Sequence, residues 1–133
     1  MKIGLDVMGG DYAPTTTIGG AILAQKELPA SDKIVLIGNE EIILQQLAAL
    51  NGNPNDFEII HTTQVIEMGD APLKAFNTKA DSSIAVGLKK LRNREIDTFS
   101  SAGNTGAMLV GSIYSVSSIQ GVIRPCITSV LPK

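Results

Sequence analysis

A stretch of small, uncharged polar residues, SSAGNTGAM at residues 100–108, lies between two apolar segments that are both typical of a protein core. The start of a helix leaves about four N–H groups without partners and carries roughly half a positive charge, so it attracts a phosphate or a developing oxyanion. Gly103 and Gly106 would let such an anion approach the backbone closely. Further donors would come from the side chains of Ser101, Asn104 and Thr105. We therefore predict an anion-binding turn here, with Asn104 among the catalytic residues; a capped turn that binds nothing is the alternative.

A second glycine-containing stretch, DVMGGDYAPTT at residues 6–16, begins within the first apolar run of the chain. Gly9 and Gly10 permit a positive φ or a close approach to a ligand, and Asp11 follows them directly. We predict that the two glycines bind substrate and that Asp11 takes part in catalysis. A plain strand-to-helix turn, with Asp11 as a local cap, is the alternative.

Lys79 begins the sequence KADSS and could supply the positive charge that both glycine stretches lack. Ser82 and Ser83 fall in the first turn of a predicted helix that Asp81 could cap, and we count both serines as phosphate-binding candidates. His61, the only histidine, ends a predicted strand and could carry a proton. The alternatives are a solvated lysine and a histidine that makes structural hydrogen bonds only.

The remaining chemistry-bearing residues predict little further function. The chain has neither a Cys/His cluster nor a spaced set of carboxylates, so we expect no metal and no cofactor. Glu67 and Asp70 are expected to be solvated rather than paired. Cys126, the only cysteine, lies in an apolar run and is expected to be a buried small hydrophobe rather than a nucleophile.

Strand-like and helix-like segments alternate along the chain and must position these residues. The strands are expected at residues 2–8, 33–38, 57–63, 97–101 and 126–132. The helices are expected at residues 15–28, 39–50, 81–94 and 104–116. Thr15 or Thr16 would cap the first helix, and residues 64–83 form a long irregular segment. The alternation predicts a three-layer, Rossmann-like α/β fold, with a mostly parallel sheet and helices on both faces. Ligands of such sheets bind beyond the carboxyl ends of the strands, where both glycine stretches fall.

Composition limits the classes of function. The 133 residues suffice for one domain, and the formal net charge of −2 gives no basic surface for nucleic acid. Asp6 and Asp11 interrupt the N-terminal apolar run too early for a signal peptide, and no window approaches the ~20 apolar residues of a membrane span. We expect a soluble, cytoplasmic protein that could still touch a membrane surface.

Five motifs, in their order along the chain, together resemble the N-terminal part of the phosphate acyltransferase family of bacterial phospholipid synthesis. The motifs are IGLDVMGGDYAP, IIHTTQVIEM with a proline four residues on, KADSSIAVGL, SAGNTGAM and GVIRPCITSVLP. The similarity covers essentially all 133 residues. The order of MGGD-x-AP and SAGNTGA makes it much more specific than a lone glycine loop.

The resemblance implies a reaction in which inorganic phosphate attacks the thioester of acyl-acyl carrier protein, giving acyl phosphate and the free carrier thiol. It also implies a fold like that of phosphotransacetylases and the isocitrate dehydrogenase group, a homodimer when full length, and contact with the inner face of the membrane. Lys79 would offset phosphate charge, and Asp11 or His61 would move the proton. The residues that match the family motifs are Gly9, Gly10, Asp11, His61, Lys79, Ser82, Ser83 and residues 101–107.

Two departures from the family pattern stand out. The segment AFNTKADSS lacks the additional basic residues that family members commonly carry just before the matching lysine. The chain is also much shorter than family members, so we expect residues 1–133 to form the N-terminal α/β lobe of a longer acyltransferase, with an incomplete fold and no second domain. The alternatives are a phosphotransacetylase-like enzyme that uses acyl-coenzyme A, or a lobe without catalytic activity. A nucleotide-dependent dehydrogenase is disfavoured, because no G-x-G-x-x-G motif with a downstream acid follows the first strand.

Overall fold

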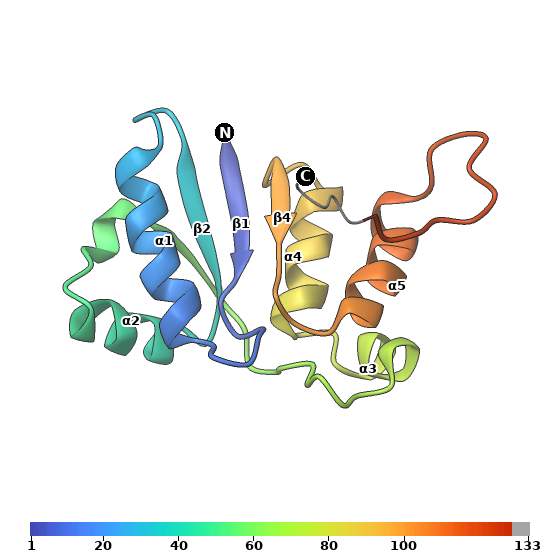
Figure 1. The fold of residues 1–133 in the computed structure, drawn as a ribbon, viewed down its shortest axis with the longest axis horizontal. Coiled ribbons are helices and arrows are strands. Elements are labelled where there is room, and N and C mark those ends of the chain that lie inside the picture. The colour runs from blue at the N-terminus through green and yellow to red at the C-terminus, as the bar shows by residue number, and fades with distance from the viewer. Residues whose placement is uncertain (129–133) are drawn as a thin grey trace, which may run out of the picture.

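Four parallel strands form one sheet in the computed structural model, which describes residues 1–128. The strands are β1 (Lys2–Asp6), β2 (Lys33–Gly38), β3 (Glu58–His61) and β4 (Thr98–Ser100), and they lie in the order β3-β2-β1-β4 (Figure 1). The predicted α/β class with a parallel sheet is therefore confirmed.

Five α-helices flank this sheet within the described residues. They are α1 (Thr15–Glu27), α2 (Glu40–Ala49), α3 (Pro72–Thr78), α4 (Ser83–Arg92) and α5 (Thr105–Val116), and a 3₁₀ turn, η1 (Pro54–Asp56), precedes β3. Helices α1 and α2 pack on one face of the sheet and α4 packs on the other, while α5 lies against α4 and α3 lies against α5 (Figure 1). The predicted Rossmann-like arrangement in three layers is present.

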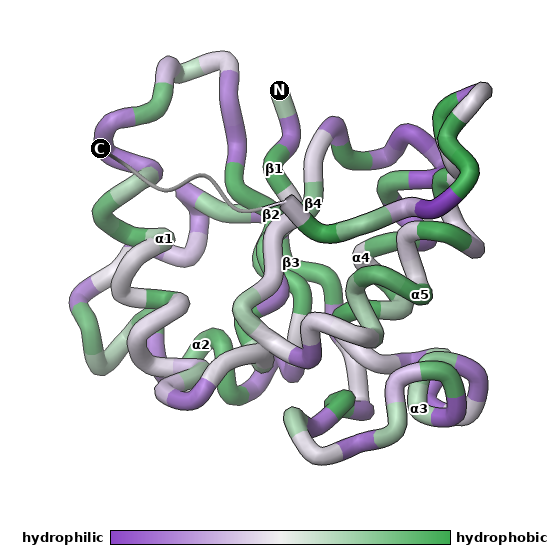
Figure 2. Tube along the Cα trace, turned by 45° about the vertical axis from the view of Figure 1, so that its right-hand side comes forward, coloured by the Kyte–Doolittle hydropathy of each residue, from purple (hydrophilic) through white to green (hydrophobic). Residues whose placement is uncertain are grey.

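The central strand β2 shows why its sequence is almost continuously apolar. Ile34 and Leu36 point into the cluster formed with α1 and α2, whereas Val35 and Ile37 point into the cluster formed with α4. All four side chains are buried, because a parallel strand with helices on both faces has no side open to water. Figure 2 shows hydrophobic residues within the strands at the centre of the fold and others along α5.

The segment at residues 64–83 is more ordered than predicted, because it contains α3. This helix begins at Pro72, whose ring fixes a helical φ and lacks the N–H that a first-turn residue cannot use. It is short and buries only Ala75, so its sequence carries almost no helical pattern. Tertiary contacts described below hold it in place.

Two of the predicted helix caps are wrong. The N-cap of α1 is Pro14, which makes no side-chain hydrogen bond, so neither Thr15 nor Thr16 caps that helix. The N-cap of α4 is Ser82, whose hydroxyl accepts from the amide of Ala85. Asp81 instead accepts from the amide and the hydroxyl of Thr63, because the chain after β3 runs alongside the start of α4.

The predicted fifth strand is absent from the part of its range that the structure describes. Residues 126–128 are not in a strand, and the rest of that prediction, residues 129–132, lies outside the described residues. Cys126 is exposed rather than buried, since no strand carries it into the sheet. Among residues 1–128, no helix combines the length and the apolar composition that crossing a bilayer requires.

The strand order reverses its direction at β1. The chain steps from β1 to β2 to β3 and then returns to the other side of β1 to form β4. The loops that leave the carboxyl ends of β1 and β4 therefore diverge around a crevice, which is where open α/β sheets bind ligands. Both glycine stretches of the sequence are these loops: residues 7–14 after β1 and residues 101–104 after β4.

Candidate functional site

A buried carboxylate joins the two loops at the switch point. Asp6, the last residue of β1, is 1% exposed. One of its oxygens, Oδ1, accepts from the amides of Met8 and Gly9 at 3.0 and 3.1 Å, and Oδ2 accepts from the Ser101 hydroxyl at 2.7 Å. Sequence reasoning missed Asp6, although an acid that ends a buried apolar strand was a usable signal.

The same loops touch through two glycines. A Cβ on Gly9 would lie 2.8 Å from the nitrogen and 2.9 Å from the Cα of Gly103, closer than real Cβ atoms come to other atoms. Gly10 has a φ of +113°, and a side chain there would press on Ala102. The glycines predicted to admit a ligand thus also serve a structural purpose, because they let the two loops pack backbone to backbone.

The turn after β4 presents unpaired backbone donors at the start of α5. Asn104 caps this helix, and its Oδ1 accepts from the amide of Ala107 at 2.9 Å. The amides of Thr105 and Gly106 and the hydroxyl of Thr105 donate to no other atom of residues 1–128. Together with the positive end of the helix dipole, these groups can hold an anion.

Two residues of this turn that were predicted to meet a ligand, Ser101 and Gly106, also contact other parts of the protein. The Ser101 hydroxyl gives its proton to Asp6 and accepts from the Gly103 amide at 3.0 Å. Gly106 turns its Cα toward α3, where a Cβ would lie 3.0 Å from the Cβ of Pro72. The groups open to a ligand are therefore the amides of residues 105 and 106 and the Thr105 hydroxyl.

Asn104 also has a second set of contacts. Its Nδ2 donates to the carbonyl oxygens of Glu67, Met68 and Asp70 at 3.0, 3.3 and 3.1 Å, and the residue is only 5% exposed. Both polar atoms of this side chain are thus used within the protein. The predicted catalytic residue is placed at the site, where it fixes the first turn of α5 to residues 67–70.

Lys79 holds the same loop from the other end. Its ammonium donates to the Asp70 carboxylate at 2.5 Å and to the Val65 carbonyl at 2.8 Å. The hydrogen bond from Lys79, followed by that from the Glu67 amide, lowers the pKa of Asp70 below its ordinary value. The expectation that Asp70 is merely solvated is therefore wrong, and the charge predicted to meet phosphate is paired.

His61 lies at the far edge of the sheet from this turn. It ends β3, and its Nδ1 accepts from the Glu40 amide at 3.1 Å, as in the structural alternative. Three strand spacings of about 4.8 Å separate β3 from β4, which amounts to about 14 Å. The described residues therefore do not bring His61 and the turn after β4 together.

The other predicted residues fall in two places. Asp11 is exposed on the loop after β1, where it lines a shallow depression that Ala102 also lines. Ser82 and Ser83 are buried at the start of α4. Hydrogen bonds from Thr63 lower the pKa of the neighbouring Asp81. The structure thus unites the two glycine loops, Asn104 and Thr105, whereas Ser82 and Ser83 are buried and do not line the depression beside Asp11.

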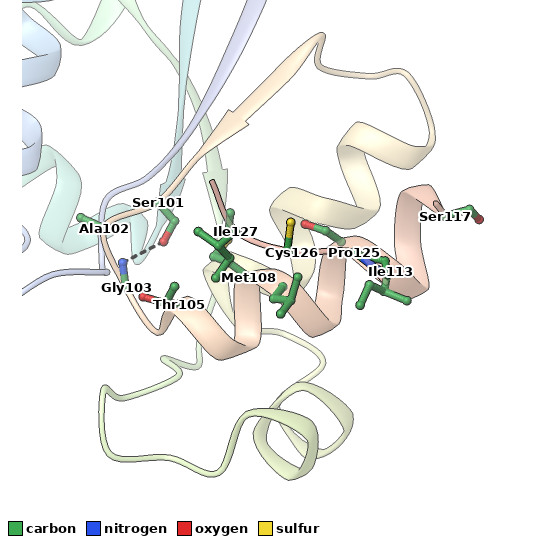
Figure 3. Close-up of a pocket in the computed structure, with 12 residues that line it drawn as sticks. Ser101, Ala102, Gly103, Thr105, Met108, Ile113, Ser117, Pro125, Cys126 and Ile127 are labelled. Carbon is green, nitrogen blue, oxygen red and sulfur yellow. Dashed lines mark hydrogen bonds between the residues drawn. The ribbon is translucent and has the colours of Figure 1, made fainter. Parts of the chain in front are cut away.

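A cavity of about 430 Å³ opens beside the turn after β4 (Figure 3). Ser101, Ala102, Gly103 and Thr105 line one end, and the cavity follows α5 toward Ser117. Within residues 1–128 its lining includes no charged side chain. In the same part of the chain, no three His, Cys, Asp or Glu side chains gather in a way that could hold a metal ion.

The sequence of this chain is similar to those of known proteins along its whole length. Residues 1–133 match the profile of a family described as "Fatty acid synthesis protein". Proteins named "Phosphate acyltransferase" from Clostridioides difficile (strain 630), Caldicellulosiruptor saccharolyticus and Dictyoglomus turgidum are 39%, 42% and 43% identical to the chain. The alignments cover 100%, 99% and 99% of this chain, and 38%, 39% and 39% of the respective relatives. The chain therefore spans about two fifths of the length of the curated relatives it matches.

Proposed function

This chain belongs to the fatty acid synthesis protein family, and from that premise we propose that it carries the phosphate-binding part of an acyltransferase. The reaction is transfer of an acyl group from acyl-acyl carrier protein to inorganic phosphate, which yields acyl phosphate for phospholipid synthesis. The observation that carries the proposal is the pair of unpaired amides, at Thr105 and Gly106, at the switch point of the sheet. The relatives named "Phosphate acyltransferase" support the same chemistry.

The reaction requires orientation more than covalent catalysis. A phosphate oxygen attacks the thioester carbonyl carbon, so that a C–O bond forms and the carbonyl oxygen becomes an oxyanion. The oxyanion then collapses, the C–S bond breaks, and the carrier thiolate takes up the proton that phosphate gives off. Holding the two reactants in contact lowers the entropic part of the barrier, and one donor aimed at the oxyanion contributes about 3 kcal/mol.

In this mechanism the start of α5 binds the anion. The amides of Thr105 and Gly106 and the Thr105 hydroxyl donate to it, while Asp6 keeps the turn after β4 in position through Ser101. No lysine or arginine of residues 1–128 lines the cavity beside this turn, so binding depends on amides and the helix dipole. We therefore expect weak phosphate binding, with a Kd of about 1 mM or higher, that falls as salt screens the dipole.

Of the two proposed proton carriers, Asp11 has the better position. It lies on the loop that packs against the turn after β4, and its side chain is exposed. His61 uses Nδ1 to hold the start of α2 and lies at the opposite edge of the sheet. We assign the proton transfer to Asp11 and the His61 ring to positioning of α2.

The same proposal includes acyl carrier protein as the acyl donor, a homodimer when full length, and contact with the cytoplasmic membrane surface. The resemblance to phosphate acyltransferases supports these three parts. The exposed apolar side chains of Ile119 and Ile123, which follow the last residue of α5, favour contact with an apolar partner or surface.

The test of anion binding uses the chain itself. Inorganic phosphate is titrated into the labelled protein, and amide chemical shifts are followed by NMR at constant ionic strength with chloride as the control. We expect saturable shifts at Thr105 and Gly106 and none at Ser83 and Ile84, which begin α4. Equal shifts at both helix starts would show non-specific association and contradict the proposed site.

A proline substitution isolates one backbone donor. Thr105→Pro removes the amide at the first helical position, where proline is tolerated, and Asn104 before it already has the extended backbone that proline requires. Thr105→Ala removes only the hydroxyl and is the matched control. Phosphate should lose most of its affinity for Thr105→Pro and less for Thr105→Ala, and equal affinities would contradict a role of this amide.

Turnover is measured in a chimera that joins this chain to the remaining part of the Clostridioides difficile relative. Acyl phosphate is trapped as hydroxamate, with acyl-acyl carrier protein and acyl-coenzyme A compared as donors. Thr105→Pro should lower kcat/KM by about 100-fold, which corresponds to the loss of one oxyanion donor. A preference for coenzyme A thioesters would instead identify a phosphotransacetylase-like enzyme.

A further inference from the structure

The cavity beside the turn after β4 has a polar end and apolar walls. Its polar end is the anion-binding turn, with Ser101 and Thr105 in the lining. From there it follows α5, so that backbone donors lie at one end and hydrocarbon surface leads away from them (Figure 3). The apolar walls are formed by Met108, Leu109 and Ile113 of α5 and, opposite them, by Pro125, Cys126 and Ile127.

This lining suits an amphiphile better than a free inorganic ion. The volume of about 430 Å³ falls within the range of small-molecule pockets, whereas an inorganic phosphate would occupy only the polar end. The rest of the lining contains no charge among the described residues, and its apolar side chains are incompletely covered: Ile113 is 38% exposed and Ile127 is 57% exposed. A hydrocarbon chain laid against them would remove this surface from water.

We propose that the groove between α5 and residues 125–127 is the acyl-chain subsite of the enzyme. This inference rests on the proposed function, because the head group of the same ligand is the acyl phosphate or the thioester held at Thr105. The chain would leave the anion-binding turn, pass Met108 and Leu109, and reach Ile113. The side chains at that far end would then decide how long an acyl chain fits.

The single cysteine reports occupancy of the groove. Cys126 is exposed, lines the groove and is the only thiol in the chain, so its rate of alkylation by iodoacetamide measures access to this wall. The probe ligand is dodecyl phosphate below its micelle-forming concentration, with butyl phosphate and inorganic phosphate as short-chain controls. Dodecyltrimethylammonium, which has the same tail and a positive head, tests the need for an anion.

We expect dodecyl phosphate to slow alkylation of Cys126 at least fivefold. The short-chain phosphates and the cationic amphiphile should slow it less than twofold. Ile113→Asp, which puts a charge in the wall, should abolish the protection. Leu44→Asp is the matched control, because Leu44 is 40% exposed on α2, away from the groove, against 38% for Ile113. This variant should retain full protection.

Ile127→Asp keeps the test decisive if Ile113→Asp does not fold. Ile127 is exposed and lies outside every helix and strand, so its replacement does not disturb a packed element. Protection is expressed as the ratio of rates with and without ligand, which removes any direct effect of the new charge on the neighbouring thiol. The loss of protection in this variant should equal that in Ile113→Asp.

The possible failures are distinguishable. If phosphate shifts the amides of Thr105 and Gly106 but dodecyl phosphate leaves Cys126 unprotected, the acyl subsite is wrong and the anion site stands. If phosphate shifts neither amide, the proposed function itself fails. Protection by anionic phosphatidylglycerol vesicles but not by monomeric dodecyl phosphate would assign the groove to a membrane surface. Slower alkylation at higher protein concentration without ligand would assign it to a second copy of the chain. Both results would overturn the proposal.

Discussion

The hydroxyl of Ser101 donates a hydrogen bond of 2.7 Å to the carboxylate of Asp6 across 95 positions of the sequence. This bond ties the carboxyl end of β4 to that of β1, the two strands between which the connections change direction. Because Asp6 also accepts from two amides of its own loop, one buried side chain sets the relative position of both loops.

Replacement of Asp6 should therefore cost more stability than replacement of its partner. Asp6→Ala leaves the Met8 and Gly9 amides and the Ser101 hydroxyl without their acceptor, and we expect a loss of about 3 kcal/mol in the free energy of unfolding. Ser101→Ala removes two hydrogen bonds, one to Asp6 and one from the Gly103 amide, and should cost about 1–2 kcal/mol. Urea denaturation measures both, and a loss below ~0.5 kcal/mol for Asp6→Ala would show that the loops are held by other contacts.

The contact between the two loops makes Gly9 intolerant of a side chain. Gly9→Ala places a Cβ against the backbone of Gly103, and we expect a loss of about 1–3 kcal/mol from overpacking. Gly20→Ala is the matched control, since Gly20 lies inside α1 with nothing within 4 Å of the added Cβ. That change should stabilise the protein by about 0.5–1 kcal/mol. Thermal unfolding measures the stability change of each variant. A change of the same sign in both would contradict the close contact at Gly9.

Asn104 can be tested for its two functions separately. Asn104→Asp keeps a strong helix cap but turns a carboxylate oxygen toward the carbonyls of Glu67, Met68 and Asp70, so we expect a loss of about 2 kcal/mol or more. Asn104→Ser also keeps a helix cap, but it removes the Nδ2 group that donates to these carbonyls and adds no negative charge. Hydrogen exchange should then accelerate at residues 67–71 while α5 stays protected. If Asn104→Asp were as stable as the parent, its amide would not hold the loop.

The Lys79–Asp70 ion pair should make the free energy of unfolding depend on pH under acidic conditions. Because folding lowers the pKa of Asp70 below 3.8, the unfolded state binds more protons as the pH falls, so stability present above that value is lost on acidification. We expect Asp70→Asn to reduce the slope of unfolding free energy against pH between about pH 5 and pH 3. Lys79→Met removes the same ion pair from its other side and should reduce the slope in the same way. An unchanged slope in Asp70→Asn would contradict the pair.

Local patterns in the sequence predicted the sheet, four of the helices and the glycine loops. The apolar run of β2 is a signal carried by neighbouring residues, and the strand is confirmed. Asp6 was overlooked and Lys79 was expected to be free, because their partners lie in other segments: Ser101 for the first, Val65 and Asp70 for the second. Pairings of that kind depend on tertiary folding, and no spacing rule within one segment reveals them.

The hydrogen bonds that Asn104 and Lys79 make to residues 65–70 have a consequence for proteolysis. Met68 is 57% exposed, and no other atom would lie within 4 Å of a Cβ added to the next residue, Gly69. Accessibility alone would therefore make this segment a site of cleavage. The carbonyls on either side, however, already accept from Asn104. A protease must first pull this segment free, so digestion there would report release of α5 rather than exposure of the loop.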